Sequence, residues 1–266
     1  MAAAGFGPAG IDAAAPADTS WGMDSLPHPY RAVVVGASGG IGSAFVKALA
    51  ADSGCARIDA LSRSGAVPEG AKIAPGPIDV TDEASVAKAA ARIAEGAPPR
   101  LVLVATGHLH GPEGGPEKSW SQLTPESLAR NFALNATGPA LVAKHLLPLM
   151  PREGRAILAA LSARVGSVAD NRIGGWYGYR ASKAALNQIL RCLAIEGARK
   201  RPDLVIAGLQ PGTVRTGLSR PFRGRVAEEN LLEPDTAAGH LLGVLDGLSP
   251  AQSGRLFDWR GEEFPP

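Results

Sequence analysis

The sequence predicts an α/β protein with a single doubly wound sheet of parallel strands and helices on both faces. Short apolar runs alternate with stretches of helical spacing along most of the chain, and this rhythm is typical of βαβ units with right-handed crossovers. The run Leu101–Ala105 is apolar at every position, as expected for a strand buried on both faces of a parallel sheet. No internal repeat or linker divides the chain, so we expect one domain.

Strands and helices are expected in regular alternation after residue 30. The predicted strands cover residues 31–35, 57–61, 73–80, 101–105, 156–161, 204–209 and 254–257. The predicted helices cover residues 41–51, 81–95, 125–150, 178–199 and 234–245. Thr81 is the expected N-cap of the second helix. The third is expected to be interrupted near the Gly138-Pro139 pair.

Composition and charge exclude several classes of protein. Apolar residues make up 45% of the 266 residues, charged residues 20%, and the net charge is +2. These values are typical of a globular chain and give no reason to expect nucleic acid or a membrane surface as the main partner. Cys55 and Cys192 lie far apart in the sequence, which favours neither a disulfide framework nor a thiolate metal site.

The N-terminal segment 1–28 differs from the rest of the chain. It contains no Lys or Arg and is rich in Ala, Gly and Pro, so we expect a flexible lead-in to a domain at 29–266. Its composition predicts neither a secretory signal nor a transit peptide. Translation could begin at Met1 or at Met23. No apolar run is long enough for a membrane-spanning helix, and we expect a cytoplasmic protein.

A glycine-rich turn follows the first predicted strand and opens the first helix. Glycines let the chain turn sharply and let a pyrophosphate approach, while the helix N-terminus supplies free N–H groups and a favourable dipole. A glycine turn without a ligand is the alternative interpretation. The residues expected to contact a dinucleotide are Gly36, Ser38, Gly40, Ile41 and Gly42.

The end of the second predicted strand bears on the choice between NAD and NADP. It reads Ser62-Arg63-Ser64, and the nearest acidic residue, Asp59, lies inside the strand. An acidic residue at this strand end binds the ribose of NAD, whereas an arginine accommodates the extra phosphate of NADP. Ser62 and Arg63 therefore favour NADP, with NAD possible, although a solvated loop arginine would look the same.

Tyr179 and Lys183 lie four residues apart on the predicted helix over residues 178–199. Residues at this spacing share one helix face, so a phenol and an ammonium group can approach one reacting centre. A free tyrosine titrates near pH ~10, and a nearby cation lowers that pKa toward the range useful for acid–base catalysis. Such pairs also occur by chance, so the glycine turn and the order of the other elements support the catalytic interpretation.

Together these motifs resemble the short-chain dehydrogenase/reductase family over residues 31–257. The resemblance implies a Rossmann-type fold and reversible hydride transfer between a nicotinamide cofactor and a carbonyl or secondary alcohol. Tyr179 would exchange the proton, and Lys183 would lower its pKa and hold the ribose. Relatives pair two long helices with those of a second copy, so the resemblance also implies a homodimer or homotetramer.

Further positions match the family pattern in order. Asn135 corresponds to the helix asparagine of the proton relay, whose backbone holds a water, whereas Asn131 is expected to be solvated or to cap a helix. Ala105-Thr106-Gly107 stands where the family has Asn-Ala-Gly, so Thr106 would replace part of the lost hydrogen bonding. The other implied cofactor contacts are Asp79 and Val80 at the adenine, and Pro211, Gly212, Val214 and Thr216 at the carboxamide and pyrophosphate.

The electrophilic serine is the position that departs most from the family. Relatives commonly have a serine pair at the end of the fifth strand, and the second serine polarises the substrate carbonyl. Here the pair reads Ser162-Ala163. Either Ser162 takes the role, or Ser167 serves, or the site works with a weaker contact.

Segments 162–167, 174–183 and 218–222 resemble a C-factor-like branch of the family, which includes small carbonyl reductases and a developmental signalling protein. An NADP(H)-binding regulator with little turnover is therefore the alternative function. An extended-type epimerase is not favoured, since the chain lacks a separate substrate domain.

The expected mouth of the site contains further polar and aromatic residues. His108 and His110 are expected to line the pocket and, without a third ligand, predict no metal site. Trp176 and Tyr177 are expected either to wall the substrate cavity or to pack the loop. Residues 218–233 predict a mobile covering loop, in which Arg220, Arg223 and Arg225 either attract an anionic substrate or are simply solvated.

Overall fold

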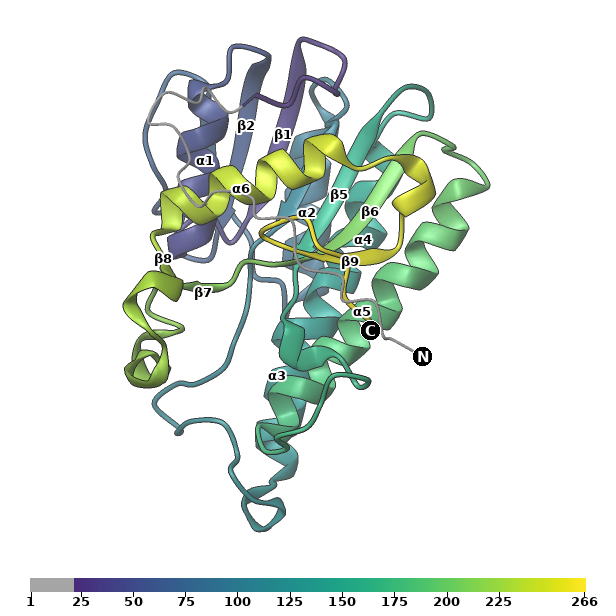
Figure 1. Ribbon diagram of the computed structural model, residues 1–266. Helices are drawn as coiled ribbons and strands as arrows, with labels where there is room; N and C mark the ends of the chain where they lie inside the picture. Colours follow the sequence, from purple (N-terminus) through teal and green to yellow (C-terminus); the bar gives the residue numbers. More distant parts are fainter. Residues whose placement is uncertain (1–21) are drawn as a thin grey trace, which may run out of the picture.

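Seven parallel strands form the central sheet of the computed structural model, which describes residues 22–266 (Figure 1). The strand order is β3-β2-β1-β4-β5-β6-β9, so the first strand lies between the second and the fourth, and the predicted doubly wound fold is confirmed. The strands are β1 (Tyr30–Val35), β2 (Cys55–Ser62), β3 (Ile73–Pro77), β4 (Leu101–Val104), β5 (Ala156–Leu161), β6 (Leu204–Gln210) and β9 (Arg255–Asp258).

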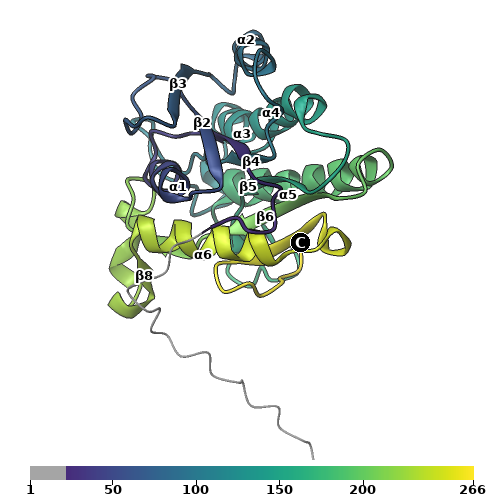
Figure 2. The same cartoon turned by 90° about the horizontal axis from the view of Figure 1, so that it is seen from above.

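Helices cover both faces of the sheet (Figure 2). α1 (Gly40–Ala51) and α6 (Pro234–Gly247) pack on one face, and α2 (Glu83–Ala94), α4 (Gly138–Leu146) and α5 (Tyr177–Ala198) pack on the other. Along β1, Ala32 and Val34 enter the first of the two apolar cores, while Val33 and Val35 enter the second. Because successive strand residues face opposite sides, a strand buried on both faces needs an unbroken apolar run.

The predicted helix over residues 125–150 is divided directly before the Gly138-Pro139 pair, near the expected place. α3 (Pro125–Phe132) leads into a wide π-helical turn, Ala133–Thr137, and Gly138 then opens α4, which ends at Leu146 before a 3-10 turn. Pro139 is tolerated because it lies in the first turn of a helix, where its missing N–H is not needed. A side chain at Gly138 would place its Cβ 2.8 Å from Val80 Cγ2. The interruption is therefore a π turn that ends directly before the Gly-Pro pair.

Several element boundaries also differ from the prediction. Asp82, not Thr81, is the N-cap of α2, and its carboxylate accepts from the N–H of Ala84 at 3.0 Å. The Thr81 hydroxyl instead donates to Asp79 at 2.7 Å, which removes it from capping. β3 ends at Pro77 rather than Val80. A parallel pair, β7 (Thr213–Val214) and β8 (Leu231–Leu232), was not predicted, and 3-10 turns at Arg220–Arg225 and Glu228–Asn230 occupy the expected covering loop.

The predicted flexible lead-in is wrong for residues 22–28, and residues 1–21 lie outside the described residues. Met23 and Leu26 are buried in the core that contains α1 and α6. The N–H of Met23 donates to the carboxylate of Asp52, at the C-terminal end of α1, at 3.0 Å. This segment therefore belongs to the domain. Between residues 22 and 266, no helix is both long and apolar enough to span a membrane.

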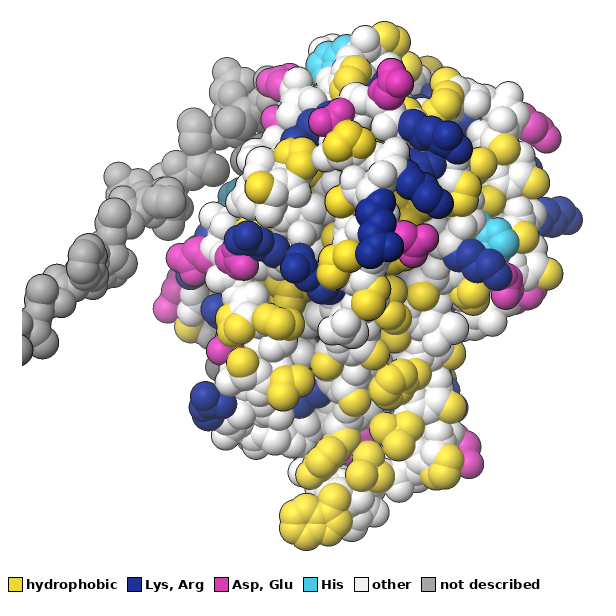
Figure 3. Space-filling view, turned by 90° about the vertical axis from the view of Figure 1, so that its right-hand side faces the viewer, with side chains coloured by type: hydrophobic (Ala, Val, Ile, Leu, Met, Phe, Trp, Pro, Cys, Tyr) yellow, Lys and Arg dark blue, Asp and Glu magenta, His cyan; other side chains and the backbone are white. Residues whose placement is uncertain are grey.

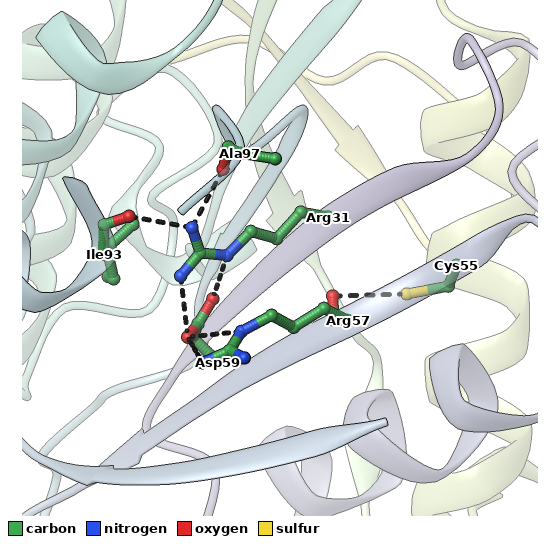
Figure 4. A network of polar contacts seen from close by, with 6 residues as sticks. All are labelled: Arg31, Cys55, Arg57, Asp59, Ile93 and Ala97. Carbon is green, nitrogen blue, oxygen red and sulfur yellow. Dashed lines mark hydrogen bonds and ion pairs between the residues drawn. The ribbon is translucent and has the colours of Figure 1, made fainter. Parts of the chain in front are cut away.

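A buried ion pair joins the first two strands (Figure 4). Arg31 on β1 and Asp59 on β2 meet with Nε and Oδ2 at 2.6 Å, and both side chains are less than 10% exposed. The Arg31 guanidinium also donates to the carbonyl groups of Ile93 and Ala97, at 2.8 and 2.9 Å, where α2 ends. Asp59 is thus held in a structural ion pair. It lies within β2, as the sequence indicated.

Removing either partner of this pair is expected to destabilise the chain strongly, because the remaining charge would be buried alone. We expect Arg31→Ala and Asp59→Ala each to lower the free energy of unfolding by about 3–5 kcal/mol, measured by urea unfolding. Arg57→Ala is the matched control. Arg57 approaches the same carboxylate at 3.4 Å, but its side chain is 56% exposed, so its loss should cost about 1 kcal/mol or less. Similar losses for Arg31 and Arg57 would contradict the interpretation.

Candidate active site

The glycine turn after β1 has the geometry of a binding site for a phosphate group. Gly36 has a φ of +88°, and a Cβ there would lie 2.9 Å from the backbone of Ala105. A Cβ at Gly42 would lie 2.1 Å from the Gly36 carbonyl oxygen. α1 then begins at Gly40 without an acidic residue in its first turn and without a side-chain cap. Its first N–H groups therefore remain available to an anion.

A cavity of about 460 Å³ opens at the carboxyl ends of the strands, beside this turn. Such a position, next to the point where the strand order reverses, is where doubly wound sheets bind ligands. Most of the residues predicted to act on the cofactor or the substrate line it together. They are Ser38, Gly40, Ile41, Ala105, Thr106, Gly107, Ser162, Tyr179, Lys183, Pro211 and Thr216.

Nine predicted positions do not line this cavity: Gly36, Gly42, Ser62, Arg63, Asp79, Val80, Asn135, Gly212 and Val214. Ser62 is 2% exposed and donates its hydroxyl to the Ala66 carbonyl at 3.5 Å, so the expectation that it binds a phosphate is not met. Arg63 is exposed on the loop after β2.

The predicted adenine contacts, Asp79 and Val80, have partners within the protein. Hydrogen bonds from Thr81, with a smaller effect of the Arg63 charge, hold the pKa of Asp79 below its usual range. Val80 packs against α4 at Gly138.

Tyr179 and Lys183 lie one turn apart on α5, and both side chains are buried. The Lys183 ammonium lies 5.8 Å from the centre of the Tyr179 ring and donates to the Leu161 carbonyl at 2.7 Å. Burial raises the pKa of Tyr179 to about 12 and lowers the pKa of Lys183 to about 8. Burial alone accounts for the raised pKa of Tyr179, so the expected lowering of this pKa by a neighbouring cation stays a prediction for the enzyme with its cofactor bound.

Asn135 lies in the π turn and is fully buried. Its Nδ2 donates to the His108 carbonyl at 2.9 Å and to the Ser182 hydroxyl at 3.1 Å, and its Oδ1 accepts from the His108 N–H at 2.8 Å. Ser182 in turn donates to the Tyr179 carbonyl at 2.9 Å. Asn131 is also buried, with its Oδ1 3.3 Å from the Asn135 amide nitrogen, so the expectation of a solvated residue is wrong. The backbone water of the relay stays a prediction.

Ser162 is the serine that the fold places beside Tyr179. It is 4% exposed and lines the same cavity, and its hydroxyl donates to Asn187 Oδ1 at 2.6 Å. The Ser167 hydroxyl instead donates to the Pro266 carbonyl at 3.2 Å, and Ser167 does not line the cavity. Of the alternatives left open by the sequence, the geometry favours Ser162.

The start of α5 depends on a residue that the sequence did not point to. Trp176 precedes the helix with a φ of +52° and makes no side-chain cap. Glu117 supplies one from a distant loop, accepting from the Gly178 N–H at 3.1 Å and from the Ser127 hydroxyl. Burial by itself would raise the pKa of Glu117, but these hydrogen bonds outweigh it and hold the pKa below its usual range. No local pattern links Glu117 to a helix that begins about 60 positions later.

A larger outer cleft of about 1160 Å³ is lined by His108, His110, Trp176 and Phe222 among others, and His108 directly follows Gly107 of the smaller cavity. The His110 ring contacts the carbonyl oxygens of Gly217 and Leu218 at 3.2 and 3.1 Å, which ties two loops together over the site. Burial lowers the pKa of His108, although the nearby Glu113 carboxylate opposes this effect. Residues 22–266 contain no group of three or more His, Cys, Asp or Glu side chains able to hold a metal.

The residues of the covering segment 218–233 are partly engaged within the protein. Arg223 donates to the Thr216 carbonyl and to the Ser219 hydroxyl, so it is not a freely solvated cation. Thr216 packs against the glycine turn, and a Cβ at Gly40 would lie 2.6 Å from its Cγ2.

The donors present at the site fit a dinucleotide. The hydroxyl of Thr106 is buried with no partner among the described residues, and Thr106 lines the cavity beside the glycine turn. A buried hydroxyl without a partner is uncommon in native proteins, and a ligand hydroxyl or amide would satisfy it. The free N–H groups of α1 and the bare Gly40 complete a surface that a diphosphate can approach.

The profile of the short chain dehydrogenase family matches residues 30–226. The chain belongs to this family. It is therefore an oxidoreductase, and the predicted family membership is confirmed.

Two curated relatives and one solved structure are similar to this short-chain dehydrogenase. It is 40% identical to C-signal of Myxococcus xanthus over 139 residues, which are 52% of this chain and 78% of that protein. It is 34% identical to 1-hydroxy-2-glutathionyl-2-methyl-3-butene dehydrogenase of Rhodococcus sp. over 226 residues, 84% and 94% of the two chains. The structure of the NADPH-bound carbonyl reductase from chicken fatty liver superposes with a TM-score of 0.78 at 26% identity, and the match covers 90% of this chain and 95% of that chain. These similarities confirm the relationship to the C-factor-like branch and to carbonyl reductases.

Lys183→Met is expected to raise the melting temperature of this short-chain dehydrogenase near pH ~7, because it removes a buried charge. Burial lowers the Lys183 pKa from 10.5 to about 8, so the folded chain holds this proton less tightly than the unfolded chain. The destabilisation is fully present below the folded pKa and disappears as the pH rises toward the unfolded value. A gain of about 1 kcal/mol corresponds to about 2–4 °C in a domain of this size.

The gain should shrink when thermal unfolding is repeated near pH ~10, where the folded lysine is already neutral. Lys88→Met on α2 is the matched control, because Lys88 is exposed and its replacement should leave the melting temperature nearly unchanged at both pH values. An equal gain at both pH values would show that the buried charge is not the cause.

Proposed function

We propose that this protein is an NADPH-dependent carbonyl reductase that transfers a hydride between the nicotinamide and a carbonyl or secondary alcohol. The observation that carries the proposal is that Tyr179, Lys183 and Ser162 line one cavity with the glycine turn. A dinucleotide on the turn and a substrate against Tyr179 would then share one space. The similarity to the NADPH-bound carbonyl reductase supports the same activity.

The preference for NADP rests on the ends of β1 and β2. No carboxylate stands at the end of β2, and Asp59 is held by Arg31 inside the sheet. Arg63 is exposed directly after β2, where the extra phosphate of NADP would lie if the dinucleotide binds as it does in this fold. A guanidinium group binds phosphate well because its N–H groups match the oxygens in pairs.

Each catalytic side chain has a role that its environment supports. When bound, the reduced nicotinamide supplies the hydride. The Tyr179 phenol is protonated at neutral pH, so it can donate a proton to the substrate oxygen as that oxygen gains charge, and a bound cofactor and Lys183 would lower its pKa toward the range useful for this transfer. Lys183 would hold the ribose and stabilise the tyrosinate that remains. Ser162 would donate a hydrogen bond to the carbonyl, and Asn135 would complete the relay that returns a proton from solvent.

We also propose that the enzyme is a homodimer or homotetramer in the cytoplasm. Apolar side chains gather over the lower part of the face on the α5 side of the molecule (Figure 3). Large apolar residues exposed on the described surface are Trp120, Leu123, Phe132, Val168, Ile173, Ile195 and Leu218. Exposed apolar patches mark interaction sites, and a second copy of the chain is the partner that the family resemblance favours. The two free cysteines are consistent with a reducing compartment.

NADPH is expected to raise the melting temperature more than NADH at matched concentrations. A ligand present at one hundred times its dissociation constant adds about 2.7 kcal/mol to the free energy of unfolding. Arg63→Ala should remove most of the NADPH advantage while leaving the NADH effect unchanged, and Arg172→Ala, another exposed arginine, should change neither. A larger effect of NADH would reverse the cofactor assignment, and no effect of either would argue against the oxidoreductase activity.

Tyr179→Phe should lower kcat for NADPH-dependent reduction by about 100-fold or more, because it removes the proton donor while keeping the ring. The measurement is NADPH oxidation with isatin as the probe carbonyl, alongside NADPH binding, which should be retained. Tyr177→Phe is the matched control, since Tyr177 lines neither cavity. NADPH binding without Tyr179-dependent turnover would favour the alternative of an NADP(H)-binding regulator.

A further inference from the structure

The proposed reductase needs a hydrogen-bond donor for the substrate carbonyl, and Ser162 is the serine available. In the structure, however, its hydroxyl donates to Asn187 Oδ1 at 2.6 Å. A serine hydroxyl has only one hydrogen to donate. In this arrangement the hydrogen points to α5, and Ser162 can only accept a hydrogen bond from a group in the cavity.

Asn187 lies on α5 four residues after Lys183 and eight after Tyr179, so the three residues share one face of the helix. Its side chain is 3% exposed. Its Nδ2 is buried and has no hydrogen-bond partner within the part of the chain that the structure describes. A buried amide that has one partnered oxygen and one unpartnered nitrogen is rare in folded proteins.

Rotation of this carboxamide by half a turn reverses the hydrogen bond. The two ends of a carboxamide have nearly the same shape, but one accepts hydrogen bonds and the other donates them. After the rotation, Nδ2 donates to Ser162 Oγ, and the unpartnered atom is a carbonyl oxygen, which proteins tolerate more often than an unpartnered N–H. The Ser162 hydrogen is then free to point into the cavity that Tyr179 and Lys183 line.

We propose that Asn187 is the positioning residue of the electrophilic serine, a role that rests on the proposed reductase function. In the reacting enzyme its amide nitrogen donates to Ser162, and this bond directs the Ser162 hydrogen to the substrate carbonyl. The backbone of Ser162 is fixed independently by its N–H, which donates to the Leu209 carbonyl at 2.7 Å. Asn187 therefore acts on the direction of the hydroxyl. This role lets the first serine position serve although Ala163 has no hydroxyl.

Neutron diffraction of deuterium-exchanged crystals grown with NADP⁺ tests the orientation directly. The proposal expects two deuterons on the Asn187 atom that faces Ser162, and the Ser162 deuteron directed into the cavity. Two deuterons on the opposite atom, with the Ser162 deuteron on the line to Asn187, would overturn it. This measurement needs no turnover, so it decides the role of Asn187 even if the proposed reaction fails.

Kinetics with isatin and NADPH test whether Asn187 acts through Ser162. Asn187→Leu keeps the branched shape without a donor and should lower kcat about 100-fold, the smaller end of the effect of losing one such hydrogen bond to the reacting oxygen. In the Ser162→Ala background the same change should have no further effect, because its target is gone. Independent losses that multiply in the double variant would indicate a merely structural role and overturn the proposal.

Two further variants separate folding from function. Asn187→Asp keeps the oxygen that accepts from Ser162 but has no N–H, so it should lower kcat as much as Ser162→Ala, and wild-type turnover would contradict the proposal. Gln188→Leu, at the exposed neighbouring position, should leave kcat unchanged. Turnover that survives Tyr179→Phe would contradict the proposed function, whereas Tyr179-dependent turnover with multiplying losses would contradict the role of Asn187 alone.

Discussion

The arrangement of the active site depends on the hydrogen bonds of one fully buried side chain, Asn135. Its carboxamide binds both backbone groups of His108 and the hydroxyl of Ser182, so it fixes the loop after β4 against the helix that carries Tyr179 and Lys183. Asn135 lies in the π turn, where the helix is wider than a regular α-helix. Such turns are rare and are often found at functional sites. The irregular helix is thus part of the site.

Burial shifts the pKa values of the proposed catalytic pair, Tyr179 and Lys183, in opposite directions. It favours the neutral form of each, which raises the pKa of Tyr179 and lowers the pKa of Lys183. A protonated phenol is suited to donating a proton, and a lysine with a pKa of about 8 can exchange its own proton near neutral pH. The rest of the fold must hold the buried Lys183 charge in place, although its burial is unfavourable. Glu117 at the start of α5 and the Lys183 contact with the Leu161 carbonyl help to do so.

The sequence was sufficient for features that depend on local pattern and insufficient for those that depend on distant contacts. The unbroken apolar strands, the glycine turn and the Tyr179–Lys183 spacing follow from periodicity and backbone sterics, so they could be predicted. Glu117 and Asn187 could not, because each becomes functional only when a distant segment reaches it. The N-cap of α2 shows the same limit on a small scale. The Thr81 hydroxyl donates to Asp79, and Asp82 therefore caps the helix instead.

The two departures from the family pattern have a common physical consequence. At Ala105 and Ala163 the chain lacks side-chain hydrogen-bonding groups on the loops that follow β4 and β5. In both places a carboxamide from a helical segment lies close to the neighbouring strand end. Asn135 holds the backbone of the loop after β4, and Asn187 meets Ser162 at the end of β5. Asn135 matches the family pattern, so it does not replace the side chain that is missing at Ala105. Both carboxamides nevertheless lie on helical segments and not on the loops that they contact, so the hydrogen bonds at both loops are supported from helices.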